Sequence, residues 1–212
     1  MQSQILNVNP LIAVFDGVFG EEVLEAARKL GEDRLEQPTY ATDDGRVVGE
    51  KRTNLAAVID QWSDPVMTEL VLKISNIMRM PPEHCETGKL LRYEGEQLFD
   101  VHHDSYEEDG PTAEDFNRGG QRLFTSLCYL NDVEDEGQTA FPNLKVAVRP
   151  KLGRVLVFQN TYHGNNKTHP DSAHVGFGPG KGVKWVFSAW WREHHFHIPR
   201  EFPPAEGEFV LY

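Results

Sequence analysis

The stretch Lys184-Trp185-Val186-Phe187-Ser188-Ala189-Trp190-Trp191 is the most informative part of the 212-residue sequence. Side chains in a β-strand point alternately to opposite faces of the sheet. Alternation divides the stretch into one face with Lys184, Val186, Ser188 and Trp190 and another with Trp185, Phe187, Ala189 and Trp191. Both faces are largely apolar, which predicts a strand covered on both sides. Lys184 is then drawn inward and needs an anionic partner, unless its chain snorkels to the surface.

Other short β-rich runs surround this strand at 123–130, 144–148 and 155–158, separated by Gly, Pro, Asn and Asp. The N-terminal part has a different pattern. A short apolar run at 11–15 precedes an amphipathic helix that ends near Gly31. Pro65, behind Ser63 and Asp64, predicts the start of a second helix.

The apolar stripe of this second helix is predicted at Val66, Leu70, Ile74, Ile77 and Met78, and Pro81 and Pro82 end it. Helices followed by many short strands predict an α+β fold, with N-terminal supporting helices packed against an antiparallel jelly roll or barrel. No composition break indicates a domain boundary. We expect one domain over 1–212, with support at about 1–87, the jelly-roll core at about 88–195 and a tail at 196–212.

The formal net charge of −12 argues against a nucleic-acid or anionic-membrane partner. Cys85 and Cys128 lack CxxC spacing, which favours two reduced, buried thiols. The first ten residues have no basic and apolar signal pattern, so we expect a cytoplasmic protein. The acidic segment 105–120, with Arg118 as its one counter-charge, predicts a mobile loop and, more sharply, a lid.

His102 and Asp104 lie two residues apart in a predicted strand, so both side chains point to one face while His103 points to the other. Two ligands so spaced can share one metal ion. A second histidine would complete the two-histidine, one-carboxylate set of non-haem iron oxygenases, which leaves three coordination positions open. His-x-Asp alone is also compatible with a solvated strand edge.

Several motifs, in a fixed order, resemble the prolyl 4-hydroxylase family of iron(II)- and 2-oxoglutarate-dependent oxygenases, in its short bacterial, algal and viral form. The resemblance runs from about residue 11 to residue 191. It rests on Arg52-Thr53-Asn54, residues 73–78, 92–96, Gly120-Gln121-Arg122, 129–134, 139–142 and 158–160, and on His174 ten residues before Lys184-Trp185. The resemblance implies a double-stranded β-helix, which is the jelly roll expected above.

The resemblance also implies site residues and cofactors. His102, Asp104 and His174 match iron ligands, and Lys184 matches the partner of the C5 carboxylate of 2-oxoglutarate. Tyr93 and Thr139 resemble its hydroxyl partners, whereas Arg122, Trp190 and Phe99 match substrate-contacting positions. The implied cofactors are Fe(II), 2-oxoglutarate, O₂ and ascorbate. The implied partner is a proline-containing peptide or protein, and a homodimer is left open.

Three departures from the family pattern concern the substrate side and nearby turns. Phe99 stands where the family usually has a tyrosine, which removes a hydroxyl that could bond the substrate. Glu136 and Gln138 replace residues of a Gly-Gly-Glu-Thr-like turn, and Val175 and Gly178 stand where Ala and Pro are commoner. His163 and His169 are rivals to His174, but neither precedes a Lys-Trp pair by ten residues. A second histidine group, His194, His195 and His197, is interpreted as an exposed tail.

The implied activity is hydroxylation of a proline residue coupled to oxidative decarboxylation of 2-oxoglutarate to succinate and CO₂. The same chemistry on a free amino acid or other small molecule is the alternative, and Phe99 is its motivation. A jelly roll that binds a metal or peptide without catalysis is a remote third hypothesis.

Overall fold

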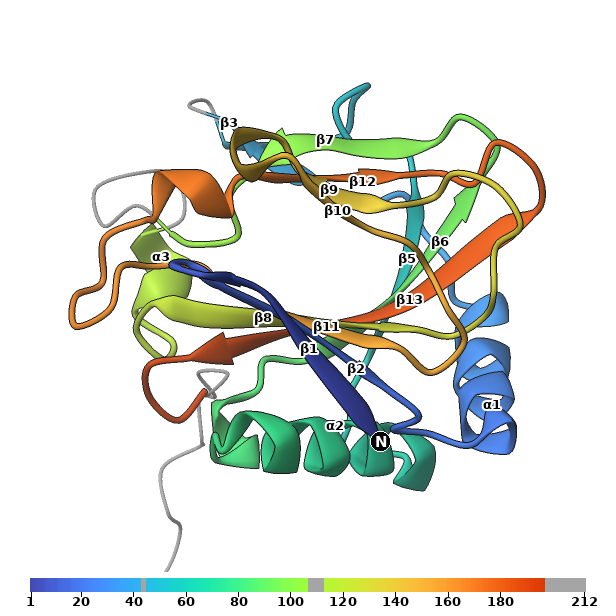
Figure 1. Ribbon diagram of the computed structural model, residues 1–212, viewed down its shortest axis with the longest axis horizontal. Helices are drawn as coiled ribbons and strands as arrows, with labels where there is room; N and C mark the ends of the chain where they lie inside the picture. The colour runs from blue at the N-terminus through green and yellow to red at the C-terminus, as the bar shows by residue number, and fades with distance from the viewer. Residues whose placement is uncertain (43–44, 107–112, 197–212) are drawn as a thin grey trace, which may run out of the picture.

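The computed structural model describes residues 1–42, 45–106 and 113–196, and its main feature is two antiparallel sheets that face each other (Figure 1). The larger sheet has the strand order β1-β2-β11-β8-β13-β6-β5, and the smaller has the order β10-β9-β12-β7. A separate two-stranded sheet pairs β3 with β4.

The elements of the larger sheet are β1 (Gln2–Val8), β2 (Leu11–Asp16), β5 (Leu55–Ile59), β6 (Gly88–Glu94), β8 (Arg122–Tyr129), β11 (Val155–Gln159) and β13 (Val183–Arg192). The smaller sheet contains β7 (Leu98–His102), β9 (Thr139–Phe141), β10 (Val146–Val148) and β12 (His174–Phe177), and the separate hairpin contains β3 (Tyr40–Thr42) and β4 (Gly45–Val47). The helices are α1 (Glu21–Glu32), α2 (Pro65–Met78) and the short α3 (Ala113–Phe116), with 3-10 turns at Pro82–His84, Pro142–Leu144 and Pro170–Ser172. The chain is therefore mostly β-sheet with few helices.

Strand β13 lies inside the larger sheet, between β8 and β6, and its two faces separate as the alternation predicts. Trp185, Phe187, Ala189 and Trp191 belong to the core between the sheet and helices α1 and α2. Lys184, Val186, Ser188 and Trp190 line a pocket on the opposite face, toward the smaller sheet. Figure 1 shows α2 along the outer face of the larger sheet and the smaller sheet on its other side.

Helix α2 begins where the sequence predicts, because the Asp64 side chain accepts hydrogen bonds from the N–H groups of Val66 and Met67 and Pro65 occupies the first turn. It ends at Met78, and the next residue, Arg79, caps it in the left-handed conformation with a φ of 56°. Its buried stripe differs from the predicted one. Met67, Leu70, Val71 and Ile74 are the buried apolar residues, while Val66 and Met78 are only partly buried.

The prediction of a strand at 144–148 is only partly correct, because Pro142 starts a 3-10 turn and β10 begins at Val146. Cys85 and Cys128 are buried free thiols, as expected. Within the described ranges no helix is long and apolar enough to cross a membrane. Of the predicted lid at 105–120, residues 107–112 lie outside the described residues, as does most of the predicted tail, at 197–212, while Ala113–Phe116 of the lid segment forms α3.

Candidate active site

The strands β7 and β12 bring the two histidines of the predicted metal site together. His102 ends β7, His174 begins β12, and the two residues are direct partners in the antiparallel register. Their ring centroids lie 4.3 Å apart. Asp104 follows β7 by two residues and is buried. The pair that sequence alternation placed on one face is therefore joined by His174 from the neighbouring strand.

The three side chains form a compact set of donor atoms. One ligand atom from each of His102, Asp104 and His174 lies within 4.8 Å of the others, and the described part of the chain holds no second group of three such residues. Each histidine Nε2 lies 3.5 Å from a different oxygen of Asp104. The burial and the donor types fit a divalent iron ion held by two imidazoles and one carboxylate.

Main-chain carbonyls fix the orientation of both imidazole rings. The Nδ1 of His102 lies 2.7 Å from the carbonyl oxygen of Asp100, and the Nδ1 of His174 lies 3.0 Å from that of Ser172. A carbonyl oxygen only accepts, so each Nδ1 carries the proton and donates it. The Nε2 lone pairs are then directed at Asp104, which is the tautomer that a metal requires.

The charge states of the site also suit a metal. Burial would raise the pKa of Asp104, but the neighbouring His174, His102 and Arg122 outweigh it and hold this pKa far below its usual range. Burial, together with the neighbouring His102, lowers the pKa of His174 to about 4. Asp104 is therefore a carboxylate and His174 a neutral imidazole at neutral pH.

A further hydroxyl orients the carboxylate. Thr125 Oγ1, from β8, donates to Asp104 Oδ2 over 2.7 Å and accepts from Asn160 Nδ2 over 3.0 Å. Thr125 and Asn160 are fully buried. One carboxylate oxygen is thus held in place by a buried hydrogen-bond network.

Lys184 lies at the opposite end of the pocket and is only 1% exposed, as the strand pattern predicts. Its ammonium donates to the carbonyl oxygen of Gly137 over 3.0 Å and to that of Phe177, and it lies 4.0 Å from the ring centroid of Tyr93. Among the described residues no carboxylate lies within ion-pair distance of it. Burial consequently lowers the pKa of Lys184 to about 7.

The predicted hydroxyl partners share this end of the pocket. Tyr93 and Thr139 are buried and line it. Thr139 Oγ1 accepts a hydrogen bond from the Tyr129 hydroxyl over 2.9 Å, so its own proton is free to point elsewhere. The lining of this pocket includes the three donor residues as well as Lys184.

The predicted substrate residues have different environments. Trp190 and Phe99 line the pocket. The Phe99 ring stacks on His102 with centroids 3.5 Å apart. Arg122 does not line the pocket. Instead it forms a two-point ion pair with Glu86 (2.6 and 2.7 Å) and stacks 4.2 Å from the Trp190 ring centroid.

Sequence analysis missed three residues of this region as site residues. Arg52 is buried, lines the pocket and stacks over Phe99 at 4.2 Å. Its segment carries part of the family resemblance, which is the signal that could have indicated it. No local sequence pattern indicates Thr125 or Glu86, because their partners Asp104 and Arg122 lie on distant parts of the chain.

The rival histidines have other environments. His163 is exposed, and His169 accepts a hydrogen bond from Asp171 N at the start of a 3-10 turn. His194 and His195 are exposed, as interpreted, and His197 lies outside the described residues. The Gly-Gly-Glu-Thr-like turn departs from the family at Glu136, whose φ is 43°, yet the next residue, Gly137, still presents its carbonyl to Lys184.

Residues 88–192 match the family described as the 2OG-Fe(II) oxygenase superfamily. This segment is thus a 2OG-Fe(II) oxygenase domain, and it contains all three donor residues and Lys184. The chain is similar to prolyl 4-hydroxylases. A putative prolyl 4-hydroxylase of Acanthamoeba polyphaga mimivirus is 33% identical over 157 residues, which are 72% of this chain and 65% of the viral protein. The chain thus spans less than two thirds of that relative.

Other known proteins agree with this placement. A probable prolyl 4-hydroxylase of Arabidopsis thaliana is 27% identical, with 92% of this chain and 73% of the plant protein covered. Among solved structures, the viral collagen prolyl hydroxylase of Paramecium bursaria chlorella virus 1 aligns with a TM-score of 0.67 at 19% identity, covering 85% of this chain and 95% of that one. A prolyl 4-hydroxylase of Pseudomonas putida aligns with a TM-score of 0.57 at 16% identity, covering 85% and 91%. These two structures establish the similarity of fold.

Proposed function

We propose that the protein is an Fe(II)- and 2-oxoglutarate-dependent hydroxylase that acts on proline residues in a peptide or protein. One observation carries the proposal. A buried His-Asp-His donor set and a buried lysine without a carboxylate partner among the described residues occupy opposite ends of one pocket. A dianionic cosubstrate that binds a metal at one end and an ammonium at the other fits this arrangement.

His102, Asp104 and His174 would hold the iron, and Lys184, Tyr93 and Thr139 would hold 2-oxoglutarate. With both bound, the site uses O₂ to hydroxylate a substrate C–H bond and converts 2-oxoglutarate to succinate and CO₂. The protein contributes ligand orientation. Main-chain acceptors keep the His102 and His174 rings in one tautomer, and Thr125 keeps one Asp104 oxygen in place.

The lysine end of the pocket would recognise a carboxylate. Lys184 supplies the charge, and its burial strengthens the interaction because little water screens it. Thr139 has a hydroxyl proton to donate, since Tyr129 already donates to its oxygen. Burial raises the pKa of Tyr93 to about 12, so its phenol stays protonated and is available as a second donor.

The peptide substrate is supported by the aromatic wall that Trp190 provides and by the similarity to prolyl 4-hydroxylases. A prolyl hydroxylase of Trichoplax adhaerens with a TM-score of 0.60 was solved with a peptide fragment of the hypoxia inducible factor. Phe99 favours a second candidate, the same chemistry on a free amino acid or small molecule. Its ring covers His102 and offers no hydroxyl to a peptide.

The proposal extends to features that accompany this activity. The two facing sheets support a double-stranded β-helix within one domain over 1–212, although β1, β2 and β5 of the N-terminal support join the larger sheet. Ascorbate would keep the iron reduced between turnovers. The homodimer, the cytoplasmic location and the absence of nucleic-acid and membrane partners remain predictions.

Succinate formation from 2-oxoglutarate tests the proposal. The purified protein is assayed in air with Fe(II) and ascorbate, with and without proline-rich peptides, and product peptides are weighed by mass spectrometry. We expect peptide-stimulated turnover and a mass gain of one oxygen, both lost in His102→Ala and His174→Ala and retained in the exposed control His163→Ala. Triad-dependent turnover that only free amino acids stimulate would favour the second candidate, and no turnover would refute the proposal.

A further inference from the structure

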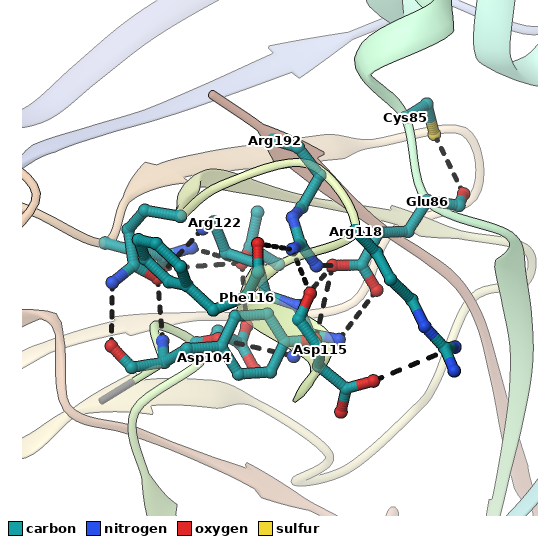
Figure 2. Close-up of polar contacts among 12 residues, drawn as sticks. Cys85, Glu86, Asp104, Asp115, Phe116, Arg118, Arg122 and Arg192 are labelled. Atoms are coloured by element: carbon teal, nitrogen blue, oxygen red, sulfur yellow. Dashed lines mark hydrogen bonds and ion pairs between the residues drawn. The ribbon is translucent and has the colours of Figure 1, made fainter. Parts of the chain in front are cut away.

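A cluster of three charged side chains, Glu86, Arg122 and Arg192, lies at the C-terminal end of β13 (Figure 2). Arg192 lies two residues after Trp190 on this strand and is fully buried. Its Nη1 donates to Glu86 Oε1 over 2.6 Å, and Arg122 Nε donates to the same oxygen over 2.6 Å. The backbones of Arg192 and Arg122 are also direct neighbours in the register of β13 and β8, at the point where this register shifts. One carboxylate therefore joins two guanidinium groups.

The second edge of the Arg192 guanidinium reaches helix α3. Its Nη2 donates to the carbonyl oxygens of Asp115 and Phe116, the last two residues of that helix, as Figure 2 shows. The Phe116 carbonyl also accepts from Gly120 N over 2.8 Å. Arg192 thus fastens the end of α3, and the turn that follows it, to the buried carboxylate.

Arg122 continues the connection to the candidate active site. Its Nη1 donates to the main-chain oxygen of Asp104 over 3.3 Å. Its guanidinium lies 4.3 Å from the ring centroid of Tyr106 and 4.2 Å from that of Trp190. The cluster therefore touches the backbone of a donor residue and one wall of the pocket.

Charge neutralisation alone does not account for Arg192. Glu86 and Arg122 already form a complete two-point pair, so the second buried guanidinium adds a desolvation cost at a carboxylate that is already paired. Carbonyl oxygens of α3 accept hydrogen bonds from its Nη2, whereas its buried Nε has no partner among the described residues. What Arg192 adds is geometric, because it links a segment outside the two sheets to the residues that frame the pocket.

We propose that Arg192 is a positioning residue of the hydroxylase, which holds the end of α3 against Glu86 and so fixes Arg122, whose guanidinium supports Trp190 in the pocket wall. The proposal rests on the proposed function for its effect on substrate. Its structural part, the attachment of α3, does not depend on activity.

The first test compares amide hydrogen exchange in metal-free wild-type protein and Arg192→Lys. A lysine keeps the charge and can pair with Glu86, but one ammonium cannot also reach both carbonyls of α3. Exchange should become about tenfold faster in a peptide covering 113–120, consistent with the loss of charge-assisted hydrogen bonds. Arg154→Lys is the matched control, since Arg154 forms a two-point pair with Asp16 elsewhere. Unchanged exchange at 113–120, or a uniform increase over the whole chain, would overturn the proposal.

The second test measures kinetics of the same variants. Arg192→Lys should raise the KM for peptide roughly fivefold or more while leaving the KM for 2-oxoglutarate unchanged, and more succinate should form per hydroxylated product. Equal changes in both KM values would overturn the substrate part. If wild-type protein shows no turnover, the proposed function fails, and the exchange experiment still decides whether Arg192 holds α3.

Discussion

Thr125 illustrates how one residue beside the metal donors prepares the site. It is fully buried on β8 and donates to one oxygen of Asp104. Thr125→Val keeps the shape of the side chain but removes this hydrogen bond, so the carboxylate can rotate. Removal of a group that orients a metal ligand typically lowers metal affinity roughly 10- to 100-fold. We therefore expect about a tenfold or greater loss of Fe(II) affinity in an anaerobic titration.

Ser126 provides the control for this prediction. It follows Thr125 on the strand, is equally buried, and accepts a hydrogen bond from Trp191 Nε1 over 2.9 Å on the other face of the sheet. Ser126→Ala should lower the melting temperature without changing metal affinity. Similar affinity losses in both variants would mean that general stability, rather than orientation of Asp104, governs binding.

Only some residues of the candidate site could be predicted from the sequence. His102 and Asp104 could be predicted together because strand alternation is a local rule. Lys184 could be predicted as buried because its neighbours on both faces are apolar. Thr125 and Glu86 could not, since the fold brings them to partners 21 and 36 residues away in sequence. Only resemblance, not periodicity, indicated His174.

Among elements, the connection between β12 and β13 is held closely against the turn between β6 and β7. A Cβ added at Gly178 would lie 2.5 Å from the carbonyl oxygen of Gln97 and closer still to that of Gly95. Both are backbone atoms, so Gly178→Ala must move the connection. The preceding residue, Phe177, accepts a hydrogen bond from Lys184. We expect about 2 kcal/mol lower unfolding free energy in denaturant titrations and a raised KM for 2-oxoglutarate.

Gly20→Ala is the matched control, because nothing lies within 4 Å of the added Cβ and this residue precedes α1 in an extended conformation. Its KM for 2-oxoglutarate should equal that of the wild type. If Gly178→Ala also leaves both stability and KM unchanged, the close approach at this connection has no energetic importance.

The elements were predictable to different degrees for physical reasons. The start of α2 was predicted because Asp64 and Pro65 act locally. Its buried face was not, because Met67 and Val71 face the core only once the sheet position sets the rotation of the helix. Strand β1 was missed because it is an exposed edge strand, and its side chains show little burial that could impose an alternating pattern.

For the whole molecule, the position of Lys184 makes stability depend on pH. Burial lowers its pKa from 10.5 to about 7 in the folded protein, so between these values the unfolded chain binds more protons than the folded one. Stability then rises with pH in that window, with a slope of up to about 1.4 kcal/mol per pH unit. Buried Cys85 and Cys128, whose pKa values are raised, oppose this trend at the upper end of the window.

A difference measurement isolates the lysine. Unfolding free energies of wild type and Lys184→Met, both without metal and cosubstrate, are compared between pH 7 and 9. The methionine variant should be more stable at pH 7. The difference in unfolding free energy between the two proteins should narrow as pH rises, because the pH then approaches 10.5, the ordinary pKa at which the lysine of the unfolded wild type loses its charge. A carboxylate bound at Lys184 would instead stabilise the ammonium. Addition of 2-oxoglutarate with a redox-inert divalent metal should therefore reverse the pH dependence of the unfolding free energy in wild type. The pH dependence of Lys184→Met should stay unchanged. A gap that stays constant with pH would mean that Lys184 keeps its proton throughout, and that its burial alone does not prepare the pocket for an anion.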